Sequence, residues 1–343
     1  MKQLGFFDLA NRYEQLSNQG DPLERLNTAV DWKIFIPLIN RAFDKTRKSS
    51  AGRKPFNRLM MFKILLLQGL YNLSDAQAEY QIKDRLSFMR FLGLALGDTI
   101  PDEKTIWAFR EILSETKTLD KLFSRFDRYL EQKGLFAELG HIVDASIIEA
   151  PKQRNSKEDN AKIKEGEVPE DFIRNPHKIR QKDIDARWNV KGGKTYYGYK
   201  NHINVDAKNK IIRSYEVTDA ASADKWQLEN LLNKVSNNEK KVWADNAYYS
   251  EDQEKRLRER GYKSRILNRG KHFSESSTIG RENSRRAKIR KRVEHVFGFM
   301  QNSMKGKFIR TIGLVRAKTK VGLMNLVYNL CRYEQLCRIS VPC

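Results

Sequence analysis

The chain has 343 residues, of which 65 are Lys or Arg and 43 are Asp or Glu, so it carries a formal charge of +22 at pH 7. Hydrophobic residues make up 40% of the chain, which is enough for a buried core and excludes a disordered polypeptide. The most apolar stretch, residues 60–71, contains Lys63 and Gln68 and is too short to cross a bilayer, so we expect no membrane anchor. So large a positive charge favours an anionic partner, and nucleic acid is the first candidate.

The three cysteines lie together near the end of the chain, at Cys331, Cys337 and Cys343, and none forms a CxxC motif. With only five histidines in the sequence, this pattern excludes a zinc finger as well as a disulfide-rich secreted domain. Charged residues also interrupt the first residues of the chain too early for a signal peptide. We therefore expect a cytoplasmic protein with reduced thiols.

Residues 1–135 are predicted to form a helical N-terminal domain. Apolar residues recur at helical spacing from Leu59 to Leu73, and Ser74, Asp84 and Asp102 are placed as N-caps of three helices that follow. Short helices joined by tight turns over residues 56–111 resemble a helix-turn-helix. On the last of these helices, Lys104 and Arg110 are candidate DNA contacts. A helical pack without any DNA contact is the alternative interpretation.

Residues 136–343 are predicted to form a second domain of mixed α/β class, with one sheet and flanking helices. Residues 152–187 are charged and lack an apolar face, which predicts a long mobile loop. The expected strands are 140–148, 194–206, 210–218, 241–244 and 262–267. The expected helices are 223–235, 251–260, 284–304 and 318–336.

Acidic residues occur at two strand positions of this domain. Asp144 lies inside the first strand, between Ile142-Val143 and Ile147-Ile148, where an unpaired carboxylate requires a cation or a raised pKa. Asp245 directly follows the strand 241–244, and ligands bind at the carboxyl ends of strands in open α/β sheets. A solvated acid on an edge strand and an ordinary turn residue are the respective alternatives.

A third acid, Glu294, lies on a later helix. A helical wheel places Glu294 and Arg290 beside the apolar stripe, so that Glu294 can reach a cleft at the sheet edge while the helix stays packed. An ordinary i, i+4 ion pair with Arg290 is the alternative. Two strand acids and one helix acid supply the oxygen ligands that Mg²⁺ prefers, and two such ions about 4 Å apart serve phosphodiester displacement.

The stretches around these acids resemble DDE-type insertion-sequence transposases, most closely the insertion-sequence-five family. They are IVDASIIEAPKQR (142–154), RWNVKGGKTYYGYKNH (187–202), VWADNAYYS (242–250) and RKRVEHVFG (290–298). Upstream, GDPLERL (20–26) and the block 56–110 resemble the N-terminal region of that family, so the resemblance covers nearly the whole chain. It implies an RNase H-like catalytic domain in which Asp144, Asp245 and Glu294 are the catalytic, metal-binding triad for two Mg²⁺ ions, with Mn²⁺ as a substitute.

The resemblance also implies the reaction, its partners, and a prokaryotic protein that is associated with the nucleoid when it is bound to DNA. Water cuts DNA at the terminal inverted repeats of the element, and the freed 3′-hydroxyls then attack target DNA. Recognition of two element ends suggests a homodimer on the DNA. The family motif around the last acid is Tyr-x2-Arg-x3-Glu-x6-Lys, and here Arg290 and Glu294 match whereas Ala287 and Gln301 replace the Tyr and the Lys.

Several basic residues are candidate DNA contacts in this domain. We expect Arg290 to clamp a phosphate, and Lys305, one turn beyond Gln301, to provide a further phosphate contact. Basic residues interleaved with tyrosines suit a strand that lies along DNA; they are Lys191, Lys194, Lys200 and His202. A half-buried strand with a solvated charged face is the alternative.

Two other functions fit part of the sequence. A non-catalytic repressor would account for the charge and for residues 56–111 but would leave the three acids without a role. An RNase H-like nuclease would use the acids but would cut without joining.

Overall fold

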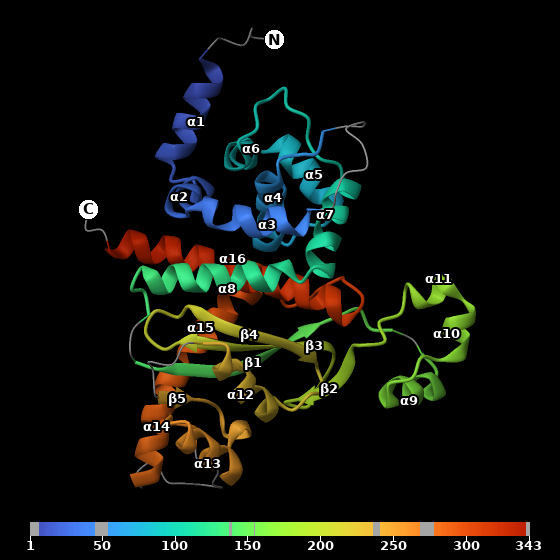
Figure 1. Cartoon of the computed structure of the whole chain (residues 1–343), viewed down its shortest axis with the longest axis vertical. Helices are drawn as coiled ribbons and strands as arrows, with labels where there is room; N and C mark the ends of the chain where they lie inside the picture. The colour runs from blue at the N-terminus through green and yellow to red at the C-terminus, as the bar shows by residue number, and fades with distance from the viewer. Residues whose placement is uncertain are drawn as a thin grey trace. The chain divides into compact units, whose positions relative to one another are not determined.

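The computed structural model describes residues 7–44, 54–136, 139–153, 155–235, 241–267 and 278–340 (Figure 1). The chain divides into two compact units, the first formed by Met1–Phe126 with Leu326–Cys343 and the second by Asp127–Asn325. Two helices, α8 (Thr118–Gln132) and α16 (Leu314–Ser340), contribute residues to both units. In the described parts of the chain, no helix has the length and apolar character of a membrane span.

The first unit is entirely helical in its described residues, as expected. Its remaining elements are α1 (Asp8–Asn18), α2 (Pro22–Ala29), η1 (Trp32–Phe35), α3 (Ile36–Ala42), α4 (Arg58–Tyr71), α5 (Asp75–Asp84), α6 (Leu86–Leu92) and α7 (Glu103–Glu115).

Helix α4 is the centre of the first unit, because residues 60–69 are buried on every side of it. Its one internal cation, Lys63, donates to Asn27 Oδ1 at 2.7 Å and to the Phe91 carbonyl at 3.2 Å, and its ammonium group lies 4.6 Å from the centre of the Trp32 ring. Burial lowers the pKa of Lys63 to about 8. A helix that is apolar on all sides becomes the core of a helical unit, and here polar partners satisfy the single lysine.

The predicted caps around α5–α7 are correct in two of three places. Ser74 forms a capping box with Gln77 before α5, and the Asp102 side chain accepts from the Thr105 N–H at the start of α7. Asp84 is not an N-cap, because α5 continues through it and Arg85 precedes α6 instead.

The second unit contains a mixed sheet in the order β2-β3-β1-β5-β6, with β4 also paired to β3. The strands are β1 (His141–Glu149), β2 (Arg187–Lys191), β3 (Lys194–Asp206), β4 (Ile212–Asp219), β5 (Lys241–Trp243) and β6 (Lys263–Ser264). The α/β class expected from the sequence is therefore confirmed.

Strand β3 organises this sheet because it is long enough to pair with three neighbours. One edge pairs antiparallel with all of β1, from His141 opposite Asp206 to Glu149 opposite Gly198. The other edge pairs with β2 over its first residues and with β4 over the rest. On the far side of β1, β5 and β6 continue the sheet as parallel strands.

Helices cover both faces of the sheet. They are η2 (Asp224–Gln227), α12 (Leu228–Asn233), η3 (Asn246–Tyr248), α13 (Glu251–Glu259), α14 (Thr278–Arg290), α15 (Arg292–Gly298) and the π-helical turn η4 (Phe299–Ser303). Val143 packs with Leu228, Leu231 and Leu232 of α12 in one core cluster. Asp144 points the other way, toward α14, because successive residues of a strand face opposite sides of the sheet.

Two predicted elements differ most from the structure. The segment 152–187, expected to be a loop, contains α9 (Lys157–Glu165), α10 (Glu170–Arg174) and α11 (Pro176–Ile179), which lie together beyond the β2 end of the sheet (Figure 1). A capping box at Ser156 and the single buried side chains Ile163 and Phe172 define α9 and α10, and these are too few to produce an apolar periodicity. The single helix expected over 284–304 is instead divided into α14, α15 and η4.

We expect Gly198→Ala to destabilise the sheet. Gly198 has φ +152°, and a Cβ atom there would lie 2.2 Å from the Ile148 carbonyl oxygen, so β1 and β3 would have to separate. The free energy of unfolding should fall by roughly 2–4 kcal/mol in urea titrations. Gly298→Ala is the matched control, since a Cβ at Gly298 meets open space in a helix, and it should cost nothing. Equal stabilities of the two variants would contradict this account.

We also expect the protein to lose stability between pH 6.5 and pH 4 because His141 is buried in its neutral form. Burial and the nearby Arg213 lower the pKa of His141 to about 4, although its Nδ1 lies 3.0 Å from Asn204 Oδ1. The unfolded chain binds the proton first as the pH falls, so the free energy of unfolding decreases, by up to roughly 3 kcal/mol from this residue. In urea titrations across this pH range, His141→Asn should make the free energy of unfolding depend less on pH. An unchanged pH dependence in this variant would show that other groups cause the loss of stability.

Candidate active site

Asp144 is fixed in the middle of β1 with its carboxylate turned toward the helices α14 and α15. Its Oδ1 accepts from the Ala145 backbone N–H at 2.8 Å, and its Oδ2 accepts from Arg290 Nη1 at 2.8 Å. The Asp144 side chain is only 18% exposed. The acid that the strand pattern singled out is therefore largely buried and paired with a cation.

Arg290 joins Asp144 to Glu294. Arg290 is the last residue of α14, and its Nη2 donates to Glu294 Oε1 at 3.3 Å from the first turn of α15. The Arg290 side chain is 17% exposed and that of Glu294 is 56% exposed. The i, i+4 pair considered from the sequence is thus present, and the same guanidinium also reaches a strand 146 positions earlier in the chain.

Asp245 follows β5, the strand next to β1. The parallel register sets His141 opposite Val242 and Ile142 opposite Trp243. If this register is continued by two residues, Asp245 lies beside Asp144. Burial raises the pKa of Asp144, and the Asp245 carboxylate acts in the same direction.

The electrostatics of Asp144 suit a cation site. Burial raises its pKa, and the Ala145 N–H, Arg290 and Lys191 act in the opposite direction. A carboxylate that is costly to ionise in the interior gains more than an exposed one from a nearby positive charge. Arg290 supplies that charge in this structure.

A metal would require a rearrangement of these residues. Among the side chains that the structure describes, no three His, Cys, Asp or Glu lie close enough together to hold a metal ion. The donor set nevertheless fits Mg²⁺ in kind, since Asp144, Asp245 and Glu294 offer only carboxylate oxygens. The positions of these acids fit as well. Arg290 pairs with Asp144 and Glu294, and Asp245 follows β5, the strand next to β1.

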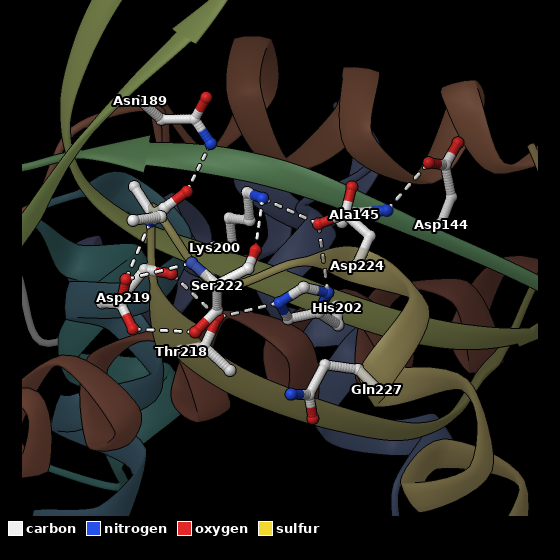
Figure 2. A network of polar contacts seen from close by, with 12 residues as sticks. Asp144, Ala145, Asn189, Lys200, His202, Thr218, Asp219, Ser222, Asp224 and Gln227 are labelled. Atoms are coloured by element: carbon white, nitrogen blue, oxygen red, sulfur yellow. Dashed lines mark hydrogen bonds and ion pairs between the residues drawn. The ribbon is translucent and has the colours of Figure 1, made fainter. Parts of the chain in front are cut away.

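Lys200 and His202 do not face solvent, in contrast to the DNA-facing strand expected from the sequence. Both are buried on the α12 face of the sheet, and Figure 2 shows both pointing toward Asp224. Lys200 Nζ donates to Asp224 Oδ1 at 2.8 Å, and His202 Nε2 lies 2.9 Å from Thr218 Oγ1. Strand alternation places both residues on one face correctly, but it cannot show that helices cover that face.

Three other predicted basic contacts of this unit are exposed. Lys191 and Lys194 flank the Gly192-Gly193 turn of the β2–β3 hairpin, where both glycines have positive φ as a tight hairpin turn requires. Lys305 is exposed just after η4. Gln301, at the position of the family's Lys, donates instead to Ser146 Oγ of β1 at 2.7 Å.

The two candidate contacts of the first unit differ from each other. Lys104 is exposed on α7, near Trp107, which is 48% exposed. Arg110 is turned inward, because its two terminal nitrogens donate to the two carboxylate oxygens of Asp75 at 2.6 and 2.7 Å. Its guanidinium therefore fixes α7 to the start of α5.

Sequence reasoning missed two residues near the site. Asp224 is the first residue of η2, and its side chain pairs with Lys200. Tyr248, three residues after Asp245, is 1% exposed. Its position inside the stretch Asp-Asn-Ala-Tyr, directly after a strand, was the available signal.

Two family models match the chain. Residues 11–111 match the family described as Transposase domain (DUF772), and residues 136–330 match the family described as Transposase DDE domain. No solved structure matches the chain. The DDE domain family implies an RNase H-like fold, and the six-stranded mixed sheet with its flanking helices agrees with that fold. Because the DDE match spans more than half of the chain, the protein belongs to the DDE-domain transposases.

Proposed function

We propose that this transposase cuts DNA at the terminal inverted repeats of its element and joins the freed 3′-hydroxyls to target DNA. Asp144, Asp245 and Glu294 are the proposed catalytic set. The convergence of acids from β1, from the end of β5 and from α15 supports the proposal. The observation that carries it is the Arg290 guanidinium, which binds Asp144 at 2.8 Å and Glu294 at 3.3 Å.

In this proposal the three carboxylates hold two divalent cations, Mg²⁺ or in its place Mn²⁺. When bound, such ions activate the attacking oxygen and stabilise the leaving oxygen in an in-line displacement. We assign Asp144 as the central ligand because it shares the Arg290 guanidinium with Glu294 and because Asp245 follows β5, the strand next to β1. Before any cation binds, Arg290 pairs with Asp144 and Glu294 and neutralises part of their charge.

Arg290 has two successive roles in the proposal. It pairs with Asp144 and Glu294 in the structure described here, and it must leave them if they are to bind cations. The released guanidinium then clamps a DNA phosphate through its parallel N–H groups. The exposed side chains of Lys191, Lys194 and Lys305 extend the phosphate contacts around the site.

The finer assignments are also proposals. We place the protein in the insertion-sequence-five group because of the four sequence stretches around its acids and the matching Arg290 and Glu294. Its helices between residues 56 and 111 would read the terminal repeat as a helix-turn-helix, with Lys104 as a phosphate contact. A homodimer would bring the two element ends together, because two equivalent DNA ends match the two-fold symmetry of a dimer.

The experiment that tests this function uses the full chain with DNA that carries the ends of its own element, in the presence of Mg²⁺. Nicks at the element boundary support cleavage, and joined products from a pre-cut 3′-hydroxyl end support strand transfer. Cleavage without joining would instead support the alternative function of an RNase H-like nuclease. DNA binding with neither cleavage nor joining would support the alternative function of a repressor.

We expect Asp245→Asn to abolish strand cleavage while DNA binding remains. The substitution keeps the shape of the side chain but removes a charged ligand, and loss of several kcal/mol of transition-state stabilisation corresponds to about 100-fold or more in rate. Single-turnover cleavage assays and gel-shift titrations measure the two effects separately. A variant that still cleaves at the wild-type rate would remove Asp245 from the catalytic set.

We expect Arg290→Met to separate cation binding from cleavage. Loss of the guanidinium leaves Asp144 and Glu294 without their internal counter-ion, so Mn²⁺ should bind at least as tightly as to the wild type, whereas cleavage should fall about 100-fold because the phosphate clamp is lost. Mn²⁺ affinity follows from the electron paramagnetic resonance signal of the free ion.

Arg286→Met is the matched control for Arg290→Met. Arg286 lies one turn earlier on α14, and it pairs with Glu282 at 2.6 Å and with the Ile266 carbonyl at 2.7 Å, not with the three acids. This control should leave Mn²⁺ binding unchanged. Weaker Mn²⁺ binding in Arg290→Met alone would mean that Arg290 supports the cation site and does not compete with it.

A further inference from the structure

A buried ion pair lies close to the proposed catalytic set but is not part of it. Lys200 Nζ donates to the Ser222 carbonyl at 2.7 Å and to Asp224 Oδ1 at 2.8 Å (Figure 2). The Lys200 side chain is 9% exposed and that of Asp224 is 26% exposed. A buried ion pair often adds little to stability compared with an apolar pair of the same size, so stability alone does not explain it.

The pair lies behind the proposed site. Lys200 is opposite Ile147 of β1 in the register, and its side chain therefore shares the face of Val143, which packs under α12. Asp144 occupies the other face, toward Arg290. A DNA phosphate at Asp144 is thus on the opposite side of the sheet from the Lys200 ammonium group.

The pair is connected to Asp245 through two short helices. Asp224 is the first residue of η2, and η2 packs against η3. Helix η3 begins immediately after Asp245, and the Tyr248 backbone N–H donates to the Asp245 carbonyl at 3.1 Å. The position of η3 therefore determines where the chain leaves β5 and where the Asp245 carboxylate lies.

Tyr248 fills the space between η2, η3 and the sheet. Its ring belongs to the core cluster that includes Leu228, the residue directly after η2, and Val143 of β1. Its hydroxyl is buried and has no hydrogen-bond partner in the described part of the chain. Burial and the carboxylates of Asp144, Asp224 and Asp245 raise the pKa of Tyr248, so the phenol lies within range of all three charges.

We propose that Lys200 and Asp224 are positioning residues for Asp245. Their ion pair holds η2 on β3, η2 supports η3 through the Tyr248 ring, and η3 sets the position of the Asp245 carboxylate relative to Asp144. This inference rests on the proposed function, since it gives Asp245 the role of a cation ligand. It assigns Lys200 to the support of the site and not to DNA.

The test is the Mn²⁺ affinity of the full chain, measured by electron paramagnetic resonance of the free ion, for Lys200→Met and for the double variant Lys200→Gln/Asp224→Asn. Groups that orient metal ligands typically change metal affinity 10–100-fold when they are replaced, and we expect a loss of this size in Lys200→Met. The double variant replaces the charged pair with an amide pair that can still form a hydrogen bond, so it should recover most of the affinity. DNA binding in gel-shift titrations should not change in either variant.

Lys234→Met is the matched control for lost stability. Lys234 also donates to one backbone carbonyl, of Tyr215 at 2.9 Å, and to one carboxylate, of Glu216 at 2.6 Å, but it lies after α12 and not at η2. This variant should keep wild-type Mn²⁺ affinity. All variants are compared by circular dichroism at a temperature at which each remains folded.

The inference is overturned if folded Lys200→Met binds Mn²⁺ within twofold of the wild type, or if Lys234→Met loses as much affinity. A loss of DNA affinity in Lys200→Met would instead restore Lys200 as a DNA contact. Asp245→Asn is measured alongside: if it keeps wild-type Mn²⁺ affinity, the proposed catalytic set itself is wrong. If only Asp245→Asn loses affinity, the set stands and the positioning role fails.

Discussion

The electrostatic problem of the second unit is how to keep a buried strand carboxylate, that of Asp144, near other acids. Asp144 interacts unfavourably with Asp245 and is itself costly to ionise, and Glu294 adds a third negative charge nearby. One guanidinium, that of Arg290 at the end of α14, pairs with both Asp144 and Glu294. Strand β1 carries Asp144, the break between α14 and α15 separates Arg290 from Glu294, and β5, which precedes Asp245, runs parallel to β1.

Buried charges in this protein are consistently paired with polar groups from distant parts of the chain. Lys63 is held by a side-chain oxygen and a backbone carbonyl, and Lys200 by a backbone carbonyl and a carboxylate. Arg213 binds Asp127 at 2.9 Å. Because an unpaired buried charge costs several kcal/mol, each pairing also restricts how its surrounding elements can be arranged. A strongly basic composition therefore overstates the charge that is available to a partner.

Local signals allowed correct prediction of several elements. Ser74 and Asp102 cap their helices because a cap depends on residues only a few positions apart, and the strand containing Asp144 follows from its β-branched neighbours. The direction of a side chain depends on what covers each face, and for this reason the inward orientations of Lys200 and Arg110 were not evident. The strand β2 was missed although Trp188 and Val190 alternate before the glycine turn, because both are exposed and define no buried face. Of the candidate site, the three acids could be proposed from the sequence; the contact between Arg290 and Asp144 could not, since it joins residues far apart in the chain.

The π-helical turn η4 has a consequence for the way sequence motifs are counted in this protein. An α-helix repeats every 3.6 residues, whereas a π turn closes its hydrogen bond one residue later, so the helix accommodates one additional residue there without losing its course. The seven-residue interval from Glu294 to Gln301 crosses this turn, and Gln301 ends against Ser146 of the sheet. An angular position calculated from Glu294 for a regular helix is therefore displaced beyond Phe299. Alignment of distant relatives in this stretch should therefore allow a one-residue gap. Two side chains on either side of the turn can occupy the same positions in space in two relatives while the number of residues between them differs by one.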